Sequence, residues 1–280
     1  MAYLLETVAG LDRLSLRLQT YRQLPEIHLT KSLAELNQLW RDRWQKRVPL
    51  QYLLGVATWR NFLLQVSPAV LIPRPETEEI IDLALHSIAQ NLIEQPQHWA
   101  DLGTGSGAIA LGLATAFPNA TVHAVDCSPE ALAIAQANVQ QYGCGGLSAQ
   151  KDLEQIHSER IYLYQGQWFS PLSLLKGKLT GVVANPPYIP TEMISELQPE
   201  VANHEPHLAL DGGQDGLESI REIIATAPDY LVSNGLLLLE IMIGQASTVV
   251  NLLQQQTNYC NIQVHTDLSG VERFILADRV

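Results

Sequence analysis

Four consecutive residues, Asn185-Pro186-Pro187-Tyr188, follow a short apolar run at residues 181–184. The apolar run predicts a buried strand, and the prolines end it because they fix φ and lack an N–H. Asn185 precedes a proline, which biases its backbone to an extended conformation. An amide, two carbonyl groups and an aromatic ring are thus held stiffly at the carboxyl end of a strand, where open α/β sheets bind ligands. Taken alone, an Asn-Pro-Pro sequence is also typical of a simple turn.

A second stretch, Asp101-Leu102-Gly103-Thr104-Gly105-Ser106-Gly107, lies between a predicted strand and a predicted helix. Glycines at such a place let the backbone approach a ligand closely and expose N–H groups at the start of the helix. Asp126, 21 residues after Gly105, ends the next predicted strand. A carboxylate there can accept both hydroxyl groups of a ribose. The two features together predict a site for an adenosyl ligand.

Two classes of adenosyl ligand fit these residues. Gly103, Gly105 and Ala108 match the G-x-G-x-x-A form of a dinucleotide fingerprint, so an NAD-dependent enzyme is one alternative. Asp101 favours a different ligand, because a carboxylate before the loop can hold a cationic amino group but would repel a pyrophosphate. The Asn-Pro-Pro-Tyr segment also has no evident role in hydride transfer.

The elements that must position these residues alternate between strand and helix after residue 96, which is typical of a parallel sheet with helices on both faces. The predicted strands cover residues 99–102, 121–125, 161–164, 181–184, 236–242, 262–267 and 273–277. The predicted helices cover residues 76–86, 108–117, 129–142, 217–230 and 245–256. Leu268-Ser269-Gly270 can close a hairpin between the last two strands. We therefore expect a doubly wound, mostly parallel seven-stranded sheet with an antiparallel last strand, in a domain of residues 76–280.

Two smaller units precede this domain. Residues 1–47 predict a small helical domain, because leucines recur at three- and four-residue intervals and Pro25 separates two helical runs. The second run begins at Thr30-Lys31-Ser32, and we expect its aromatic residues to belong to a core. Residues 48–75 predict a hairpin linker. Its short extended runs are 51–54, 62–66 and 70–72.

Composition narrows the possible partners. Apolar residues make up 46% and charged residues 16% of the 280 residues, which is typical of a globular protein. The formal charge of −12 argues against duplex nucleic acid, although residues 31–47 hold five Lys or Arg. Cys127, Cys144 and Cys260 lack CxxC spacing, which suits a reducing cytosol. No apolar run is long enough to span a membrane. We expect a cytoplasmic monomer without a membrane partner.

The segment His204-Glu205-Pro206-His207 suggests a metal site at first sight. A zincin requires two histidines four residues apart on a helix, but Leu208 occupies the required position and Pro206 disrupts a helix. We expect no metal, and a loop beside the active site in which Glu205 helps to shape the substrate pocket. Gly212-Gly213-Gln214 predicts a turn. Serine-hydrolase and Walker motifs do not occur in the sequence.

The glycine loop, the acidic residue after the second strand and Asn-Pro-Pro-Tyr after the fourth resemble class I S-adenosylmethionine-dependent methyltransferases that modify a planar nitrogen. More specific segments resemble the family of peptide chain release factor glutamine methyltransferases. These segments are Val70-Leu71-Ile72-Pro73-Arg74-Pro75-Glu76-Thr77-Glu78, Trp168-Phe169, Glu205-Pro206, Ala209-Leu210-Asp211-Gly212-Gly213, Asp215-Gly216 and Asp267-Leu268-Ser269-Gly270. The resemblance covers nearly the whole chain, although the first 45 residues match only as a helical domain.

This resemblance implies S-adenosylmethionine as the cofactor and class 1 peptide chain release factors as protein substrates, recognised by the N-terminal domain. By position, the cofactor contacts are Gly103, Thr104, Gly105, Ser106, Gly107, Asp126, Trp168 and Asn185. The substrate contacts are Asn185, Pro186, Pro187 and Tyr188, of which Asn185, Pro186 and Tyr188 are expected to be catalytic. Two segments depart from the family pattern. Gln167 replaces a common acidic residue, and Thr58-Trp59-Arg60-Asn61-Phe62 is unlike the usual acidic-aromatic hairpin.

The implied chemistry is methylation of a glutamine amide, a poor nucleophile whose lone pair is delocalised into its carbonyl. We expect the Asn185 oxygen and the Pro186 carbonyl to accept its two N–H groups, with Tyr188 packing on the flat amide. No strong base is needed. Two alternatives stay open: methylation of an adenine or guanine exocyclic amine, which the net charge disfavours, and a non-catalytic cofactor-binding or ribosome-associated module, which the intact Asn-Pro-Pro-Tyr segment disfavours.

Overall fold

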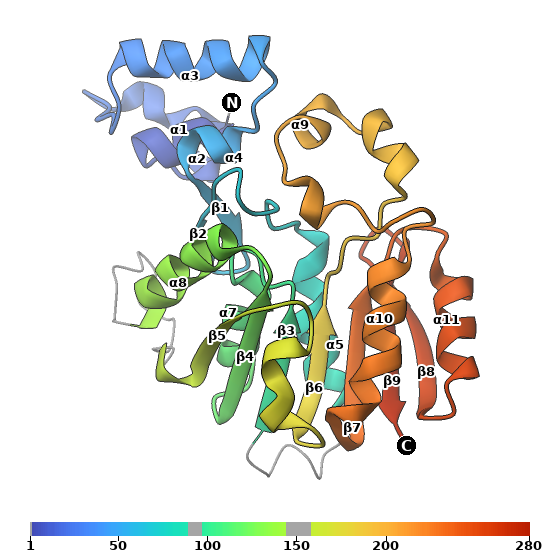
Figure 1. Ribbon diagram of the computed structural model, residues 1–280. Coiled ribbons are helices and arrows are strands. Elements are labelled where there is room, and N and C mark those ends of the chain that lie inside the picture. The colour runs from blue at the N-terminus through green and yellow to red at the C-terminus, as the bar shows by residue number, and fades with distance from the viewer. Residues whose placement is uncertain (1, 89–96, 144–157) are drawn as a thin grey trace.

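The computed structural model describes residues 2–88, 97–143 and 158–280, and it has a group of short helices above an α/β sheet domain (Figure 1). The N-terminal helices are α1 (Ala2–Ala9), α2 (Arg13–Leu18), η1 (Thr20–Gln23), α3 (Leu33–Gln45) and α4 (Leu50–Leu54). The first predicted helical run is split, because Gly10 adopts a left-handed φ of 62° after α1 and the Asp12 side chain caps α2.

The longest of these helices, α3, begins at a capping box in which Ser32 and Glu35 satisfy each other's backbone N–H groups. It contributes no buried residue. Trp40 is 40% and Trp44 76% exposed, so the expectation that the aromatic residues of this domain form a core was wrong for both. The physical reason is that no core cluster in the described part of the chain includes a residue of α3, while ion pairs of Arg43 and Arg47 with Glu200 hold the end of the helix.

The linker contains one helical turn and one hairpin. β1 (Val56–Trp59) pairs antiparallel with β2 (Phe62–Gln65), as the hairpin prediction requires. The predicted extended run at 51–54 is instead helix α4. Pro49 lies just before this helix and Gly55 ends it with a φ of 73°, an asymmetry typical of helices that the strand interpretation overlooked. Residues 70–72 form no strand, and Val70 and Ile72 pack with Ala57 and Val66 against Ala131 of α8 (Pro129–Gly143).

The sheet domain contains seven strands in the order β5-β4-β3-β6-β7-β9-β8. Among the strands of the described residues, only β9 runs antiparallel to its neighbours, which confirms the predicted mostly parallel sheet with an antiparallel last strand. The strands are β3 (Gln97–Leu102), β4 (Ala120–Asp126), β5 (Ile161–Gln165), β6 (Leu179–Ala184), β7 (Leu231–Glu240), β8 (Tyr259–Thr266) and β9 (Glu272–Arg279).

Helices cover both faces of this sheet (Figure 1). The helices on one face are α5 (Glu79–Ser87), α7 (Ala108–Ala116) and α8 (Pro129–Gly143), and those on the other are η4 (Ser170–Leu175), α10 (Glu218–Thr226) and α11 (Ala246–Gln255). Side chains alternate along β6, so Val183 joins the first core and Val182 the second. The remaining turns are η2 (Glu76–Glu78), η3 (Ser158–Arg160), η5 (Thr191–Glu196), α9 (Pro199–Ala202), η6 (His207–Ala209) and η7 (Ala227–Asp229).

The chain reverses its direction across the sheet between β3 and β6. β3 is followed by β4 and β5 on one side, and β6 by β7 on the other. Such a switch point leaves a crevice at the carboxyl ends of the two central strands. The glycine loop follows β3 and the Asn-Pro-Pro-Tyr segment follows β6, so the sheet brings both predicted motifs to this crevice.

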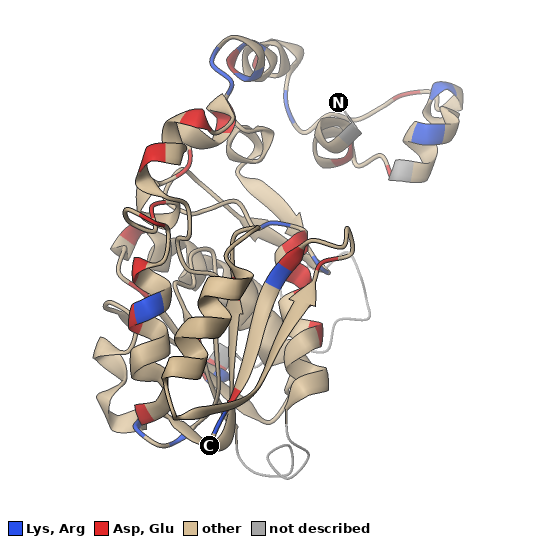
Figure 2. Ribbon diagram, turned by 90° about the vertical axis from the view of Figure 1, so that its right-hand side faces the viewer, with Lys and Arg blue, Asp and Glu red and all other residues tan. Residues whose placement is uncertain are grey.

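Charge is unevenly distributed along the chain (Figure 2). Residues 1–47 hold eight Lys or Arg and five Asp or Glu, whereas the rest holds nine and 24. Within residues 2–88, 97–143 and 158–280, every helix is too short or too polar to cross a membrane. Cys127 and Cys260 are free thiols, and Cys144 lies outside the described residues.

Candidate active site

A cavity of about 480 Å³ opens at the carboxyl ends of the central strands, a volume typical of small-molecule sites. Its walls come from the linker, the glycine loop, the end of β4, the turn after β5 and the Asn-Pro-Pro-Tyr segment. The predicted residues that line it are Gly103, Thr104, Gly105, Ser106, Asp126, Trp168, Asn185 and Pro187. Gly107, Pro186 and Tyr188 do not line it.

The glycine loop depends on backbone angles that only glycine adopts freely. Gly103, Gly105 and Gly107 have φ values of 77°, 53° and 82°. The N–H groups of Gly103 and Thr104 both donate to the Val125 carbonyl, at 2.8 and 2.9 Å, which ties the loop to the end of β4. Gly107 is the N-cap of α7, and a Cβ there would lie 3.4 Å from the Cβ of Ala135. Gly107 therefore shapes the loop from behind.

The Asp126 carboxylate is held in place by two backbone N–H groups, one of which belongs to the glycine loop. Gly105 N–H donates to Oδ2 at 2.8 Å and Ser128 N–H donates to Oδ1 at 2.9 Å. Burial raises the pKa of this carboxyl, and the N–H groups of Ser128 and Gly105 oppose the rise. Each carboxylate oxygen has a further lone pair that can accept from a ligand hydroxyl.

Asp101 does not lie on the cavity wall, although we expected it to face a cationic amino group. It is fully buried, and the Thr104 hydroxyl donates to its Oδ2 at 2.6 Å. Its Oδ1 has no hydrogen-bond partner in the described part of the chain. Burial raises the pKa of Asp101 to about 7, against the opposing effect of the Thr104 hydrogen bond. Thr104 thus separates the predicted carboxylate from the cavity.

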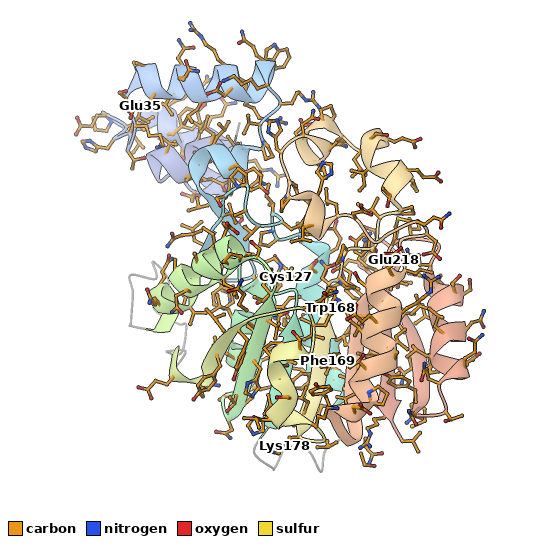
Figure 3. The ribbon with its side chains drawn as sticks, viewed as in Figure 1. Glu35, Cys127, Trp168, Phe169, Lys178 and Glu218 are labelled. Atoms are coloured by element: carbon orange, nitrogen blue, oxygen red, sulfur yellow. The ribbon has the colours of Figure 1, made fainter. Side chains whose placement is uncertain are left out.

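Trp168 lies on the cavity wall in a strained conformation. Its φ of 46° falls in the left-handed region, which costs about 1–3 kcal/mol for a residue of this size and is found mainly at functional sites. Its ring lies 3.5 Å from the position that a Cβ on Gly103 would occupy. Its buried Nε1 has no partner among the residues described. Trp168 and Cys127, both labelled in Figure 3, line the same cavity.

Gln167, one of the departures from the family pattern, turns its amide toward α10. Its Nε2 donates to Glu222 Oε2 at 3.2 Å, and its backbone N–H donates to the Ser170 hydroxyl at 3.0 Å. The residue still borders the cavity, but its side-chain donor is engaged elsewhere.

A hydrogen-bonded chain connects the two ends of the Asn-Pro-Pro-Tyr segment. Asn185 Nδ2 donates to Thr77 Oγ1 at 3.3 Å, and the Thr77 hydroxyl donates to Glu240 Oε2 at 2.6 Å. Tyr188 donates its hydroxyl to Glu240 Oε1 at 3.3 Å. Thr77 and Glu240 are 5% and 1% exposed. The amide and the phenol therefore share one buried carboxylate.

Burial raises the pKa of Glu240 to about 7, while the Thr77 hydroxyl, the charge of Arg273 and the Tyr188 hydroxyl favour its ionised form. Burial and the Glu240 charge together raise the pKa of the Tyr188 phenol. Sequence reasoning missed Glu240 and the role of Thr77. A signal was present, since Glu240 is the one charged residue in the apolar run at residues 235–244.

Two buried amides support the site, and sequence reasoning missed both. Gln245 Nε2 donates to the carbonyls of Tyr188 and Gly216, at 3.0 and 3.2 Å. Asn138 is fully buried on α8 and donates to the carbonyls of Gln65 and Ser106, at 3.0 and 2.8 Å. Asn138 thereby joins the linker hairpin to the glycine loop. These hydrogen bonds join residues that are far apart in the chain, so no spacing pattern in the sequence predicts them.

The loop at residues 204–207 forms one ion pair and two contacts between histidine rings and backbone carbonyls. Both oxygens of the buried Glu205 accept from Arg74 Nη2 at 2.8 Å, and Arg74 lines the cavity. His204 Nε2 lies 2.8 Å from the Lys46 carbonyl, and His207 Nε2 lies 3.2 Å from that of Ala202. In the described ranges, no group of three or more His, Cys, Asp or Glu side chains is placed to hold a metal.

The residues on the wall fit an adenosyl ligand. The cavity offers carboxylate acceptors at Asp126, a glycine loop that leaves room for a ligand, and a buried indole donor at Trp168 that has no partner in the described part of the protein. Asn185 carries a carbonyl oxygen to which no described residue donates. These features can hold an adenosyl group beside an amide acceptor for a second molecule.

Comparisons with known proteins agree with this geometry. A family model described as a methyltransferase domain matches residues 100–162. The chain is 48% identical over 273 residues to the release factor glutamine methyltransferase of Thermosynechococcus vestitus, covering 98% of this chain and 88% of that protein. It is 49% identical over 278 residues to the Synechocystis sp. protein of the same name, with the same shares covered.

Solved structures support the fold. A methyltransferase from Pyrococcus furiosus superposes with a TM-score of 0.51 at 15% identity, covering 88% of this chain and 96% of that chain, which shows a shared fold. The two relatives above are similar over almost the whole chain, including the N-terminal helices. This chain belongs to the family of release factor glutamine methyltransferases.

Proposed function

We propose that this protein transfers a methyl group from S-adenosylmethionine to the side-chain amide nitrogen of the glutamine in the Gly-Gly-Gln loop of class 1 peptide chain release factors. The observation that carries the proposal is the placement of Asn185. It lies on the same cavity wall as the glycine loop and Asp126, with its Nδ2 engaged by Thr77. Its Oδ1 is left to accept from a substrate amide.

S-adenosylmethionine supplies an electrophilic methyl group on a sulfonium. Asp126 would accept the ribose hydroxyls, the glycine loop would lie against the amino acid part, and Trp168 would cover the nucleoside. Gly107 would act through the shape of the loop. Thr104, rather than Asp101, would meet the ligand, because its side chain lies between that carboxylate and the cavity.

For the substrate, Asn185 Oδ1 and the Pro186 carbonyl would accept the two N–H groups of the glutamine amide. This orients the nitrogen and stabilises the positive charge that develops on it, and orientation of this kind contributes on the order of 7–11 kcal/mol in favourable cases. Pro187 borders the cavity, and Tyr188 would support the flat amide from behind. The methylated amide cation loses its proton to water, so neutral Asn185 suffices.

We assign a role to each of the three predicted units of the chain. Residues 1–47 would recognise the release factor, residues 76–280 would form the catalytic domain, and residues 48–75 would connect these two domains. The exposed Trp40 and Trp44 and the excess of Lys and Arg in residues 1–47 suit a docking surface for a protein. We infer that the enzyme acts as a cytoplasmic monomer on protein rather than on nucleic acid.

The experiment compares three substrates. Purified protein is incubated with labelled S-adenosylmethionine and, separately, a release factor, duplex DNA and ribosomal RNA. We expect label in the release factor, and an Asn185→Ala variant that still binds the cofactor should lose the transfer. Label confined to nucleic acid would reject the proposal, as would wild-type transfer by the Asn185→Ala protein.

A further inference from the structure

The hydroxyl of Thr77 makes two contacts but has only one hydrogen. Glu240 Oε2 lies 2.6 Å away and Asn185 Nδ2 lies 3.3 Å away. An ionised carboxylate only accepts, so the hydroxyl hydrogen must point to Glu240. The oxygen of Thr77 can then serve Asn185 only as an acceptor, and this requires the NH₂ group of the Asn185 amide to face Thr77.

We propose that Thr77, held by Glu240, is a positioning residue that fixes the rotation of the Asn185 amide so that its carbonyl oxygen faces the substrate. The inference rests on the proposed function and deepens it. The oxygen and the NH₂ group at the end of an asparagine side chain have nearly the same shape, but the oxygen accepts hydrogen bonds and the NH₂ group donates them. With the amide reversed, two N–H donors of Asn185 would face the N–H donors of the glutamine, and the substrate nitrogen would lose its acceptor.

The surroundings of Glu240 keep this arrangement in place. Tyr188 donates to the other carboxylate oxygen at 3.3 Å, so both oxygens are engaged by donors. Arg273 on β9 contributes a favourable charge and Glu76 on η2 an unfavourable one. Glu240 is 1% exposed and Thr77 5% exposed, so water competes little for these bonds. The carboxylate thereby sets the direction of hydrogen bonding from Tyr188 and from Asn185.

The test is a pair of substitutions at Thr77 with a matched control. Thr77→Val keeps the shape of the side chain but removes the hydroxyl, and Thr77→Ser restores it. Thr180→Val is the control, since Thr180 is also 5% exposed and hydrogen-bonded, to the His98 N–H at 3.2 Å, but lies near the opposite end of β6. The measurements are kcat and KM for methylation of a release factor, cofactor Kd by calorimetry, and thermal unfolding.

We expect Thr77→Val to lower kcat about 3- to 10-fold, the factor that corresponds to one net hydrogen bond. Cofactor Kd should stay within about twofold, because Thr77 acts on the substrate acceptor through Asn185. Thr77→Ser should recover most of the rate, and Thr180→Val should keep the wild-type rate.

Three results would overturn the inference: a wild-type kcat in folded Thr77→Val, equal losses in the Val and Ser variants, or a loss confined to cofactor affinity. If Thr77→Val does not fold, the Ser variant decides, since a retained hydroxyl must retain kcat. The proposed function fails in a different way, when the wild-type protein itself transfers no methyl group to the release factor.

Discussion

Replacing Glu240 by glutamine should make the folded protein more stable at alkaline pH. The carboxyl has a pKa of about 7 in the folded protein against an ordinary value of 4.5, because burial disfavours its charge. A raised pKa means that the folded state binds a proton more tightly than the unfolded state. The free energy of unfolding therefore decreases as pH rises from 4.5 through 7, and levels off above that.

The magnitude follows from the difference between the two pKa values. At about 1.36 kcal/mol for each pKa unit, an ionised Glu240 costs the folded state about 3 kcal/mol at pH 8.5. The glutamine amide in Glu240→Gln is neutral at every pH, so the variant should avoid this cost while keeping the shape of the side chain. At pH 5.5 Glu240 is protonated in the folded protein but ionised in the unfolded chain, so the same relation leaves a difference of about 1.4 kcal/mol between wild type and Glu240→Gln.

The assay is urea unfolding of the ligand-free protein at pH 5.5 and pH 8.5. Glu196→Gln, at an exposed site on η5, serves as the control for a change of surface charge. Asp101 also has a pKa raised to about 7, but its contribution cancels when wild type and variant are compared at the same pH. A Glu240→Gln protein whose stability falls with pH as steeply as the wild type would refute the reasoning.

Three further predictions concern activity and the loop. Because the Thr77 contact needs ionised Glu240, kcat/KM should rise from pH 6 to pH 8 with a midpoint near 7, and a flat pH–rate profile would contradict this. Asp126→Ala should weaken S-adenosylmethionine binding by roughly 1.5–3 kcal/mol in calorimetry. The control Asp229→Ala, at the far end of the sheet, should bind as wild type does, and an Asp126→Ala protein with wild-type affinity would argue against the ribose contact. Asn138→Ala strips hydrogen bonds from Gln65 and Ser106, so it should cost about 2–4 kcal/mol in unfolding experiments, and an unchanged midpoint would show that the bridge is dispensable.

Much of the fold could be predicted from the sequence because its patterns are local. The alternation of strand and helix and the prolines after β6 each depend on a few neighbouring residues. The structure confirms the seven-stranded sheet and its antiparallel last strand. The failures have two causes. Residues 51–54 form a helix between Pro49 and Gly55, a local signal that the strand interpretation overlooked. Trp40 and Trp44 are exposed because no core in the described part of the chain covers that side of α3.

In the site, too, motifs within a short stretch of sequence were found, whereas contacts between distant residues were missed. The glycine loop and Asp126 were found from spacing alone, but spacing left a dinucleotide enzyme open, and family membership resolves that alternative. Asn138 and Gln245 could not be found, because their partners are distant in sequence. Asp101 was assigned to the ligand because it directly precedes the glycine loop, whereas the structure buries it beneath the Thr104 side chain.

The identity of the methylated atom tests the proposed function most directly. A release factor is incubated with this protein and S-adenosylmethionine and then mapped by tandem mass spectrometry, beside a release factor whose Gly-Gly-Gln glutamine is replaced by alanine. We predict one added methyl group on the side-chain nitrogen of that glutamine and none in the substituted factor. A methyl group on another residue, or equal methylation of both factors, would contradict the assignment.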